Sequence, residues 1–366
     1  MPIFSRAYYQ THDFTASTFE PPLGSGPYKV GSVDVGRSIE YDRVENWWAR
    51  DLPVSRGAYN FDRLRIEFYR ERDIAFEAFK KGNLTFREDS SPDLGTGYDF
   101  PAMRQKRVIK TTYPDGRPSG AQGWFFNTRR KKFADPRTRE AIGLAFDFEW
   151  TNEPLFYGLY TRTNSFFENS PMKAMGKPSP EELKLLELFR GQVPDEVFGE
   201  VWTAPVSDGS GRDRKLLGRA NALLTKAGWI RQGKQLIDEN GQPLTIEFLA
   251  NSPSFERIVQ PFANALIRLG IDARFRLVDP SQYQARLNNF DFDVTSRRYA
   301  LAATPGEAIR EFWGIRSATT AVSSNLAGIA SPAIDALIEK VIHATSRKQM
   351  TIAARALDRG LRAGHY

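Results

Sequence analysis

The pattern of residues 244–278 constrains the fold more than any other part of the sequence. An apolar strand is predicted over residues 244–249, and a helix follows, whose apolar residues recur at three- and four-residue spacing. Gly270 ends that helix, and apolar and charged residues then alternate along a second strand over residues 271–278. Two strands joined through a helix lie parallel, with a right-handed connection in nearly all known cases. The sequence therefore predicts an α/β fold with a parallel pair in its sheet.

A second strand–helix unit precedes this one. Residues 121–127 form a predicted strand with three consecutive aromatic side chains, and it ends in Asn127. Asp135 stands where a side chain can accept hydrogen bonds from the first turn of a helix, and Pro136 at the first helical position has no N–H to lose. We therefore expect a helix over residues 137–147.

The remaining predicted elements are short, and turn and cap residues near them in the sequence indicate where some of them begin and end. Asn240-Gly241 is a tight-turn signal and predicts a hairpin between residues 235–237 and residues 244–249. Ser346 is the expected cap of the last helix. The other predicted strands are residues 28–30, 39–43, 64–69 and 292–295, and the other predicted helices are residues 73–81, 102–106, 181–189, 215–227, 281–287 and a pair after residue 331.

Composition and motifs exclude most catalytic classes. The 366 residues contain no cysteine, which removes disulfides, thiolate metal sites and cysteine catalysis. The three histidines lie far apart, and neither a His-Glu-x-x-His motif, nor a Gly-x-Ser-x-Gly elbow, nor a phosphate-binding loop occurs. We expect no cofactor and no metal. Asp291 and Asp293 are the one conceivable acid/base pair; solvated or hydrogen-bonded carboxylates are the alternative.

The charge pattern is that of a protein with dispersed charge. The net charge of +7 is modest for this length. The one dense basic run, residues 129–132, occupies a predicted turn and is interpreted as solvated. Nucleic-acid binders concentrate their excess charge in one stripe, so we expect no nucleic-acid partner.

Several motifs follow one another in a family-specific order, and the chain resembles family 5 of the bacterial extracellular solute-binding proteins over most of residues 20–361. Those proteins are the peptide-, nickel- and sugar-capturing receptors of ABC importers, and the resemblance is strongest to the oligopeptide and microcin C receptor branch. The motifs are Gly24-Ser25-Gly26-Pro27-Tyr28, Asn46-Trp47-Trp48, Ala75 with Phe79 and Gly82, Phe126-Asn127 with Asp135, Arg137, Arg139 and Ala141, Lys226-Ala227-Gly228-Trp229, Leu269-Gly270-Ile271, Asp291-Phe292-Asp293, and Pro305-Gly306-Glu307 with Phe312 and Trp313.

The resemblance implies an α/β fold of the type II periplasmic-binding-protein kind, with two lobes, mixed sheets and an incomplete first lobe. Residues 1–120 would be the partial first lobe, with antiparallel strands and a helix. Residues 121–127 would be the strand that crosses the hinge. Residues 128–366 would be the second lobe, without its return to the first.

The function implied by the resemblance is capture without chemistry. The protein would be a periplasmic monomer that closes its lobes around an oligopeptide or peptide-like conjugate and delivers it to the transmembrane subunits of an ABC permease. The alternatives are an enzyme or a sugar-binding protein on the same two-lobe scaffold.

Six residues are the expected ligand contacts: Phe126, Asn127, Arg298, Tyr299, Glu307 and Trp313. Phe126 and Asn127 end the crossing strand, and Asn127 either binds a ligand amide or caps the following turn. Arg298 and Tyr299 follow the late strand, where α/β sheets bind ligands. Arg298 would pair a ligand carboxylate or make a surface ion pair, and Glu307 would pair a ligand ammonium. Trp313 would line the cleft or the core.

The sequence departs from the family pattern in two respects. Peptide receptors of the family place an Asp just after the late strand, whereas residues 300–306 hold no carboxylate. The N-terminal residues lack a basic region followed by an apolar core, so they do not form a secretory signal, and we interpret the chain as a fragment. We expect the 366 residues alone to bind ligand poorly, because one wall of the cleft would be missing.

Overall fold

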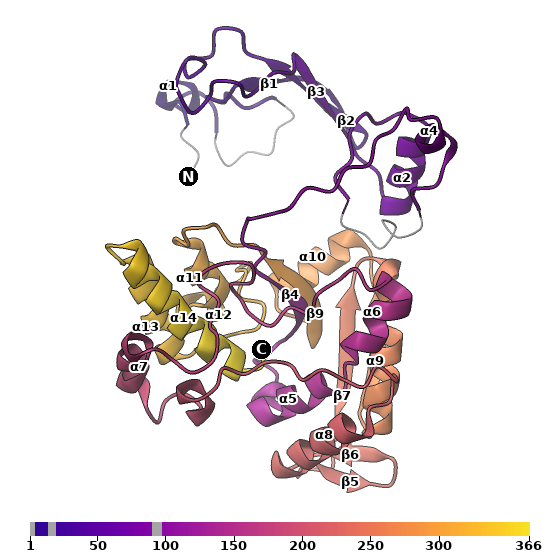
Figure 1. The fold of residues 1–366 in the computed structure, drawn as a ribbon, viewed down its shortest axis with the longest axis vertical. Helices are drawn as coiled ribbons and strands as arrows, with labels where there is room; N and C mark the ends of the chain where they lie inside the picture. The colour runs from indigo at the N-terminus through magenta and orange to yellow at the C-terminus, as the bar shows by residue number, and fades with distance from the viewer. Residues whose placement is uncertain (1–3, 14–19, 90–96) are drawn as a thin grey trace. The chain divides into compact units, whose positions relative to one another are not determined.

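The computed structural model describes residues 4–13, 20–89 and 97–366, which divide into two compact units (Figure 1). Unit 1 comprises the described residues up to 89 together with residues 99–108. Unit 2 comprises residues 97, 98 and 109–366. The boundary after Val108 falls before the expected one at residue 120, so residues 109–120 belong with unit 2.

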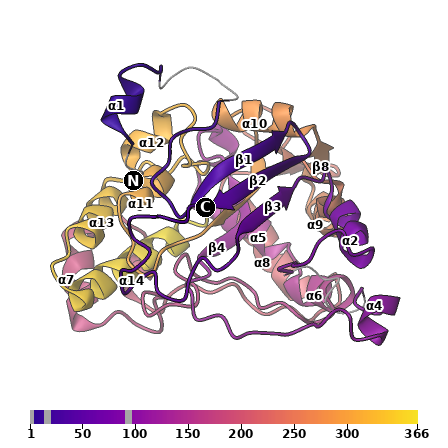
Figure 2. The same ribbon diagram turned by 90° about the horizontal axis from the view of Figure 1, so that it is seen from above.

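Unit 1 is built on a small antiparallel sheet (Figure 2). Its strands are β1 (Tyr28–Asp34), β2 (Ser38–Arg43) and β3 (Arg63–Glu67), and its helices are α1 (Arg6–Tyr9), α2 (Arg72–Lys80) and α4 (Pro101–Arg104). The strands and the α2 helix expected from the sequence are confirmed. One face of the sheet carries charged residues in ion pairs, such as Arg63 with Asp42 and Arg65 with Glu40. The opposite face is apolar and stays partly open, with Val33 and Ile66 more than two-fifths exposed.

Unit 2 is built on a four-stranded mixed sheet in the order β4-β9-β7-β8. The strands are β4 (Ala121–Phe126), β7 (Thr245–Ala250), β8 (Asp272–Leu277) and β9 (Val294–Tyr299). β7 runs parallel to both β8 and β9, while β4 pairs antiparallel with β9 at the edge. The helix between β7 and β8 is α9 (Glu256–Arg268). The parallel pair predicted from residues 244–278 is therefore confirmed.

Helices cover both faces of this sheet (Figure 1). On one face, Phe126, Phe248 and Val294 pack with residues of α5 (Pro136–Leu144), α8 (Arg214–Lys226) and α9. On the other face, Phe125 and Tyr299 pack with residues of the C-terminal helices. Those helices are α11 (Ala308–Trp313), α13 (Pro332–Ile342) and α14 (Arg347–Ala363). On the same face, α10 (Pro280–Asn288) packs on the sheet through a third apolar cluster around Leu249. All three apolar clusters found in the described residues lie in unit 2.

Local signals set the helix starts. The Asp135 carboxylate accepts from Arg137 N and the Ser346 hydroxyl from Gln349 N, so both predicted caps are confirmed.

The remaining helices are α6 (Phe148–Phe156), α7 (Pro180–Leu186) and α12 (Ile315–Thr319), with 3₁₀ turns η1 (Lys131–Phe133), η2 (Glu187–Phe189), η3 (Asp195–Phe198) and η4 (Pro253–Phe255).

The predicted hairpin around Asn240-Gly241 is confirmed only as an antiparallel bridge between Ile237 and Pro243, beside which Leu244 N donates to the Leu236 carbonyl. β6 (Gln235–Ile237) pairs antiparallel with β5 (Ile230–Gln232) through a turn in which Gly233 has a φ of 60°. A left-handed φ at this position favours glycine, so the Gly-Lys dipeptide sets the turn. The Asp238 carboxylate accepts from Asn240 N and Gln242 N and shapes a loop that carries the chain into β7.

Buried charges of α14 hold the long irregular stretch of residues 161–215. Asp358, which is fully buried, accepts from Phe166 N, Ala174 N and the Ser165 hydroxyl. Arg359 donates to the carbonyls of Met175 and Gly199, and Arg362 to those of Ala174 and Trp202. Because this irregular stretch lacks the regular backbone hydrogen bonds of helices and strands, its buried backbone groups need side-chain partners. The charged residues of α14 supply them.

A buried histidine makes the stability of unit 2 depend on pH. Burial, together with the charges of Arg139 and Arg219, lowers the pKa of His365 to about 4. The unfolded chain binds this proton near pH 6.5 and the folded chain does not, so stability falls as the pH drops from 6.5 to about 4. We expect a loss of about 3 kcal/mol across that window. Urea unfolding of the native chain and of His365→Gln, measured at pH 7 and pH 4.5, checks this: the variant should lose distinctly less stability on acidification. Equal losses would contradict it.

Candidate functional site

One edge of the unit 2 sheet gathers polar and aromatic side chains that are exposed or partly exposed. The carboxyl ends of the parallel strands β7, β8 and β9 meet there, and the antiparallel β4 begins there. Cross-strand pairing puts Gln122 opposite Arg298 and Trp124 opposite Ser296, all on one face. Trp124 packs edge-on against Phe255, with ring centroids 5.5 Å apart. We call these five residues the sheet-end surface. Open α/β sheets bind ligands at such an edge.

Arg298 and Tyr299 lie within β9 and not after it, because the strand runs to Tyr299 instead of ending at residue 295. Adjacent strand residues point to opposite faces. Arg298 is therefore exposed on the sheet-end surface, while Tyr299 is 1% exposed and donates its hydroxyl to the carbonyl of Ser324. Burial raises the pKa of Tyr299.

Phe126 and Asn127 are interior residues of unit 2. The Phe126 ring packs on Phe133 at 5.3 Å. The Asn127 side chain donates to the carbonyls of Phe290 and Phe292 at 2.9 and 3.0 Å and accepts from Arg129. Asn127 therefore ties the end of β4 to the loop before β9. β4 is the edge strand of unit 2, and a role as a crossing between lobes stays a prediction.

Replacement of Asn127 by alanine should lower stability. The change leaves the carbonyls of Phe290 and Phe292 without this donor and removes one acceptor of the Arg129 guanidinium, at a cost of about 2–3 kcal/mol. Chemical unfolding measures this loss. Asn152→Ala offers a matched control, because the Asn152 amide also binds backbone groups but in a less buried loop near Tyr160. An unchanged unfolding midpoint for Asn127→Ala would contradict the structural role and leave ligand contact as its remaining role.

Glu307 and Trp313 lie outside the sheet-end surface. One is exposed in an ion pair, and the other is buried among aromatic rings. Glu307 is exposed and pairs with Arg310, which also holds Glu339. Trp313 is 1% exposed, and its ring packs edge-on against Phe166 at 5.4 Å. Its indole N–H is buried without an acceptor in the described part of the chain.

Of the six predicted contacts, the structure thus places only Arg298 on the sheet-end surface. Ligand contact by the other five stays a prediction. Gln122, Trp124 and Phe255 were not among the predicted contacts. Alternation along residues 121–127 could have predicted the placement of Gln122 and Trp124, since both lie on the face opposite Phe125.

The prediction that residues 129–132 form a solvated turn is wrong for Arg129, which is only partly exposed. The Arg129 guanidinium donates to the carbonyls of Ala318, Asn325 and Leu326 and stacks 3.6 Å from the Phe290 ring centroid. Burial lowers the pKa of Arg129 to about 10, so it stays charged at neutral pH.

The remaining charges of this basic run neutralise the two carboxylates considered for acid/base chemistry. Lys132 pairs with Asp293 at 2.7 Å, and Arg130 pairs with Asp291 at 2.9 Å. Each of the two carboxylates is therefore already engaged in an ion pair.

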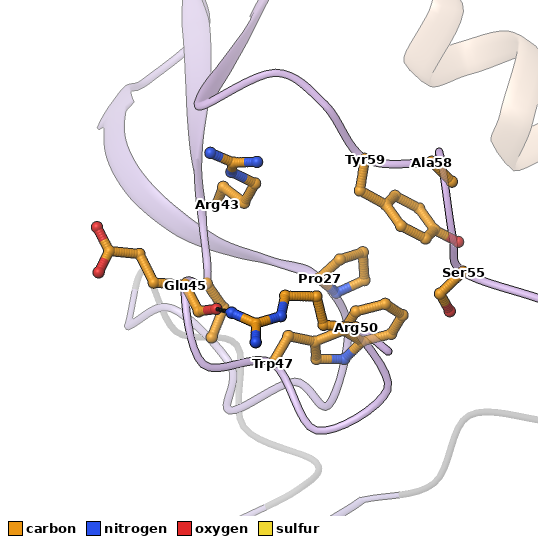
Figure 3. Close-up of a pocket in the computed structure, with 9 residues that line it drawn as sticks. Pro27, Arg43, Glu45, Trp47, Arg50, Ser55, Ala58 and Tyr59 are labelled. Carbon is orange, nitrogen blue, oxygen red and sulfur yellow. Dashed lines mark hydrogen bonds between the residues drawn. The ribbon is translucent and has the colours of Figure 1, made fainter. Parts of the chain in front are cut away.

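Unit 1 contains a separate hollow of about 310 Å³ (Figure 3). Trp47 and Tyr59 form an aromatic wall with ring centroids 5.2 Å apart. Both guanidinium groups around it already have partners: Arg50 donates to the Glu45 carbonyl, and Arg43 pairs with Asp62. The hollow therefore offers aromatic contact area, and its two cations are engaged.

The described residues contain no cluster of side chains with metal-ligand geometry. Within the same residues, every helix is too short or too polar to cross a bilayer.

A family model, the middle region of family 5 of the bacterial extracellular solute-binding proteins, matches residues 1–319. The chain belongs to this family. A putative binding protein of Brucella suis is 43% identical over 368 residues, covering the whole chain and 60% of that protein. A probable peptide-binding protein, YejA of Agrobacterium fabrum, is 41% identical over 97% of the chain and 58% of its own length. The chain thus spans about 60% of the length of these relatives.

Solved structures of the family share the fold. The oligopeptide-binding protein AppA of Bacillus subtilis, in complex with a nonapeptide, aligns with a TM-score of 0.65 at 17% identity, covering 93% of this chain and 59% of AppA. NikZ of Campylobacter jejuni, in complex with Ni(L-His), aligns with a TM-score of 0.69 at 13% identity, covering 99% of this chain and 64% of NikZ. The type II periplasmic-binding-protein fold class expected from the sequence is confirmed.

Proposed function

We propose that the chain is part of the solute-binding component of a bacterial ABC importer that captures oligopeptides or peptide-like conjugates. Membership of family 5 is the observation that carries this proposal. The relative described as a probable peptide-binding protein and the fold shared with a nonapeptide-binding protein support the ligand class. Members of the family and the relatives are binding proteins, and the engaged carboxylates Asp291 and Asp293 agree with capture without chemistry.

The sheet-end surface would provide unit 2's share of the binding wall. Trp124 and Phe255 offer flat apolar area, while Gln122, Ser296 and Arg298 offer hydrogen-bonding groups. A few polar groups set among aromatic side chains are the usual composition of a small-molecule site. The sheet below them is packed on both faces, which fixes their positions. The proposal also includes two lobes, a periplasmic location, a monomeric state and delivery of the ligand to permease subunits.

Native mass spectrometry of the complete gene product, purified from its own host, tests the proposal. We expect a co-purified species of peptide mass that leaves on mild unfolding and can be sequenced by fragmentation. A matched measurement on the 366-residue chain should show weaker retention, as expected if part of the cleft is missing. Absence of any bound species, together with failure to bind added peptide pools, would contradict the proposal.

A further inference from the structure

The charges near the sheet-end surface are not balanced. Arg298 is exposed, and among the residues that the structure describes its guanidinium makes no hydrogen bond or ion pair. The same holds for its neighbour Arg297 on the opposite face of β9. Most other arginines of unit 2 that lie in strands or helices are paired, as Arg274 is with Asp272 at 2.7 Å. Two adjacent unpaired guanidinium groups therefore mark the carboxyl end of β9.

The carboxylates around this strand are already engaged. Asp115, whose charge Arg298 influences, accepts from the backbone N–H and the guanidinium of Arg117 at 2.9 Å. Glu307, the first carboxylate in sequence after β9, pairs with Arg310. Asp279, which follows β8, caps α10 by accepting from two backbone N–H groups. Asp115, Glu307 and Asp279 are therefore already engaged and do not offer a free carboxylate to an ammonium group.

We propose that the sheet-end surface recognises a carboxylate of its ligand through Arg298. This inference rests on the proposed function and adds which end or side chain of the ligand is read. A guanidinium covered by a ligand loses its water, and this is unfavourable unless the ligand supplies an anion. The planar fork of arginine matches a carboxylate with two parallel hydrogen bonds. Gln122, directly opposite on β4, supplies an amide beside that pair.

The carboxylate has two possible sources, the C-terminus of a peptide or an acidic side chain. Four pools of random pentapeptides separate them: free at both ends, amidated at the C-terminus, N-acetylated, and amidated but with a fixed central glutamate. The complete gene product is mixed with each pool, and retained peptides are quantified by mass spectrometry after gel filtration. Amidation should reduce retention at least about tenfold, as expected for a lost charge-assisted bond. N-acetylation should have little effect, and the central glutamate should restore retention if side chains are read.

Two variants link the effect to the residue. Arg298→Gln should abolish the preference for carboxylate-bearing peptides, and Arg298→Lys should keep part of it. Arg274→Gln is the matched control, because it removes the same charge from an exposed strand position of the same sheet but leaves the proposed site intact. Retention lost on N-acetylation instead of amidation, or a preference unchanged in Arg298→Gln, would overturn the inference while peptide capture stands. Retention of none of the four pools would overturn peptide capture itself.

Discussion

Replacing Asp358 by alanine should destabilise unit 2 by about 3–5 kcal/mol, because the change leaves a buried arginine without its counterion. Asp358 is fully buried and its carboxylate accepts four hydrogen bonds. Three come from Ser165, Phe166 N and Ala174 N, and the fourth from Arg362 at 3.2 Å. Burial raises the pKa of Asp358, while these four donors favour its ionised form.

Equilibrium unfolding in urea measures the loss directly. Asp291→Ala is the control, since Asp291 is an exposed carboxylate that pairs with Arg130 and Arg286. Surface pairs contribute about 1 kcal/mol or less, so the control should unfold near the native midpoint. Adding Arg362→Met to Asp358→Ala should not restore stability, because the carbonyls of Ala174 and Trp202 would then lose their donor as well. Recovery in that double variant would show that the carboxylate serves only to balance the arginine.

Local patterns in the sequence were sufficient to predict the strands of the sheet and most helices. An apolar run predicted β7, alternation of apolar and charged residues predicted β8, and the caps Asp135 and Ser346 fixed two helix starts. The same reasoning missed the buried charges of α14. Asp358 and Arg359 lie off the apolar stripe of that helix and therefore look like solvent-facing residues. They are buried because an irregular stretch far away in sequence packs over them, and no local pattern encodes that contact.

The candidate site was predictable only in part, for a related reason. The rule that ligands bind at the carboxyl ends of strands led to Arg298, whose exposure the structure shows. Asn127 was considered because it ends the predicted crossing strand, and Trp313 because it lies on the expected rim of the second lobe; a structural role was the alternative for both. Asn127 is instead hydrogen-bonded to the loop before β9, and Trp313 is packed among phenylalanines. An asparagine or a tryptophan suits a ligand contact and an interior structural contact equally well. Only the long-range packing shows which of the two roles the residue has.

A second buried pair connects α7 to α14 and should show strong coupling. Arg359 is 1% exposed and donates to Glu182 at 3.0 Å, and Glu182 is 3% exposed. Glu182→Met removes the counterion and should cost about 3–5 kcal/mol. Arg359→Met should cost a similar amount, because the buried Glu182 then loses its closest ionic partner. The carbonyls of Met175 and Gly199 also lose their donor in that variant.

The double variant separates the free energy contributed by the ion pair from that contributed by the contacts of Arg359 with backbone carbonyls. If the pair acts as a unit, Glu182→Met with Arg359→Met should cost less than the sum of the single changes by about 2–3 kcal/mol. It should still be less stable than the native chain, since the two carbonyls stay unpaired. Glu187 and Arg190, an exposed pair at the end of the same helical segment, provide the matched cycle and should show a coupling of about 1 kcal/mol or less. Simple additivity at Glu182 and Arg359 would mean that Arg359 stabilises unit 2 through its carbonyl contacts alone, and that the ion pair between the two helices contributes nothing to the fold.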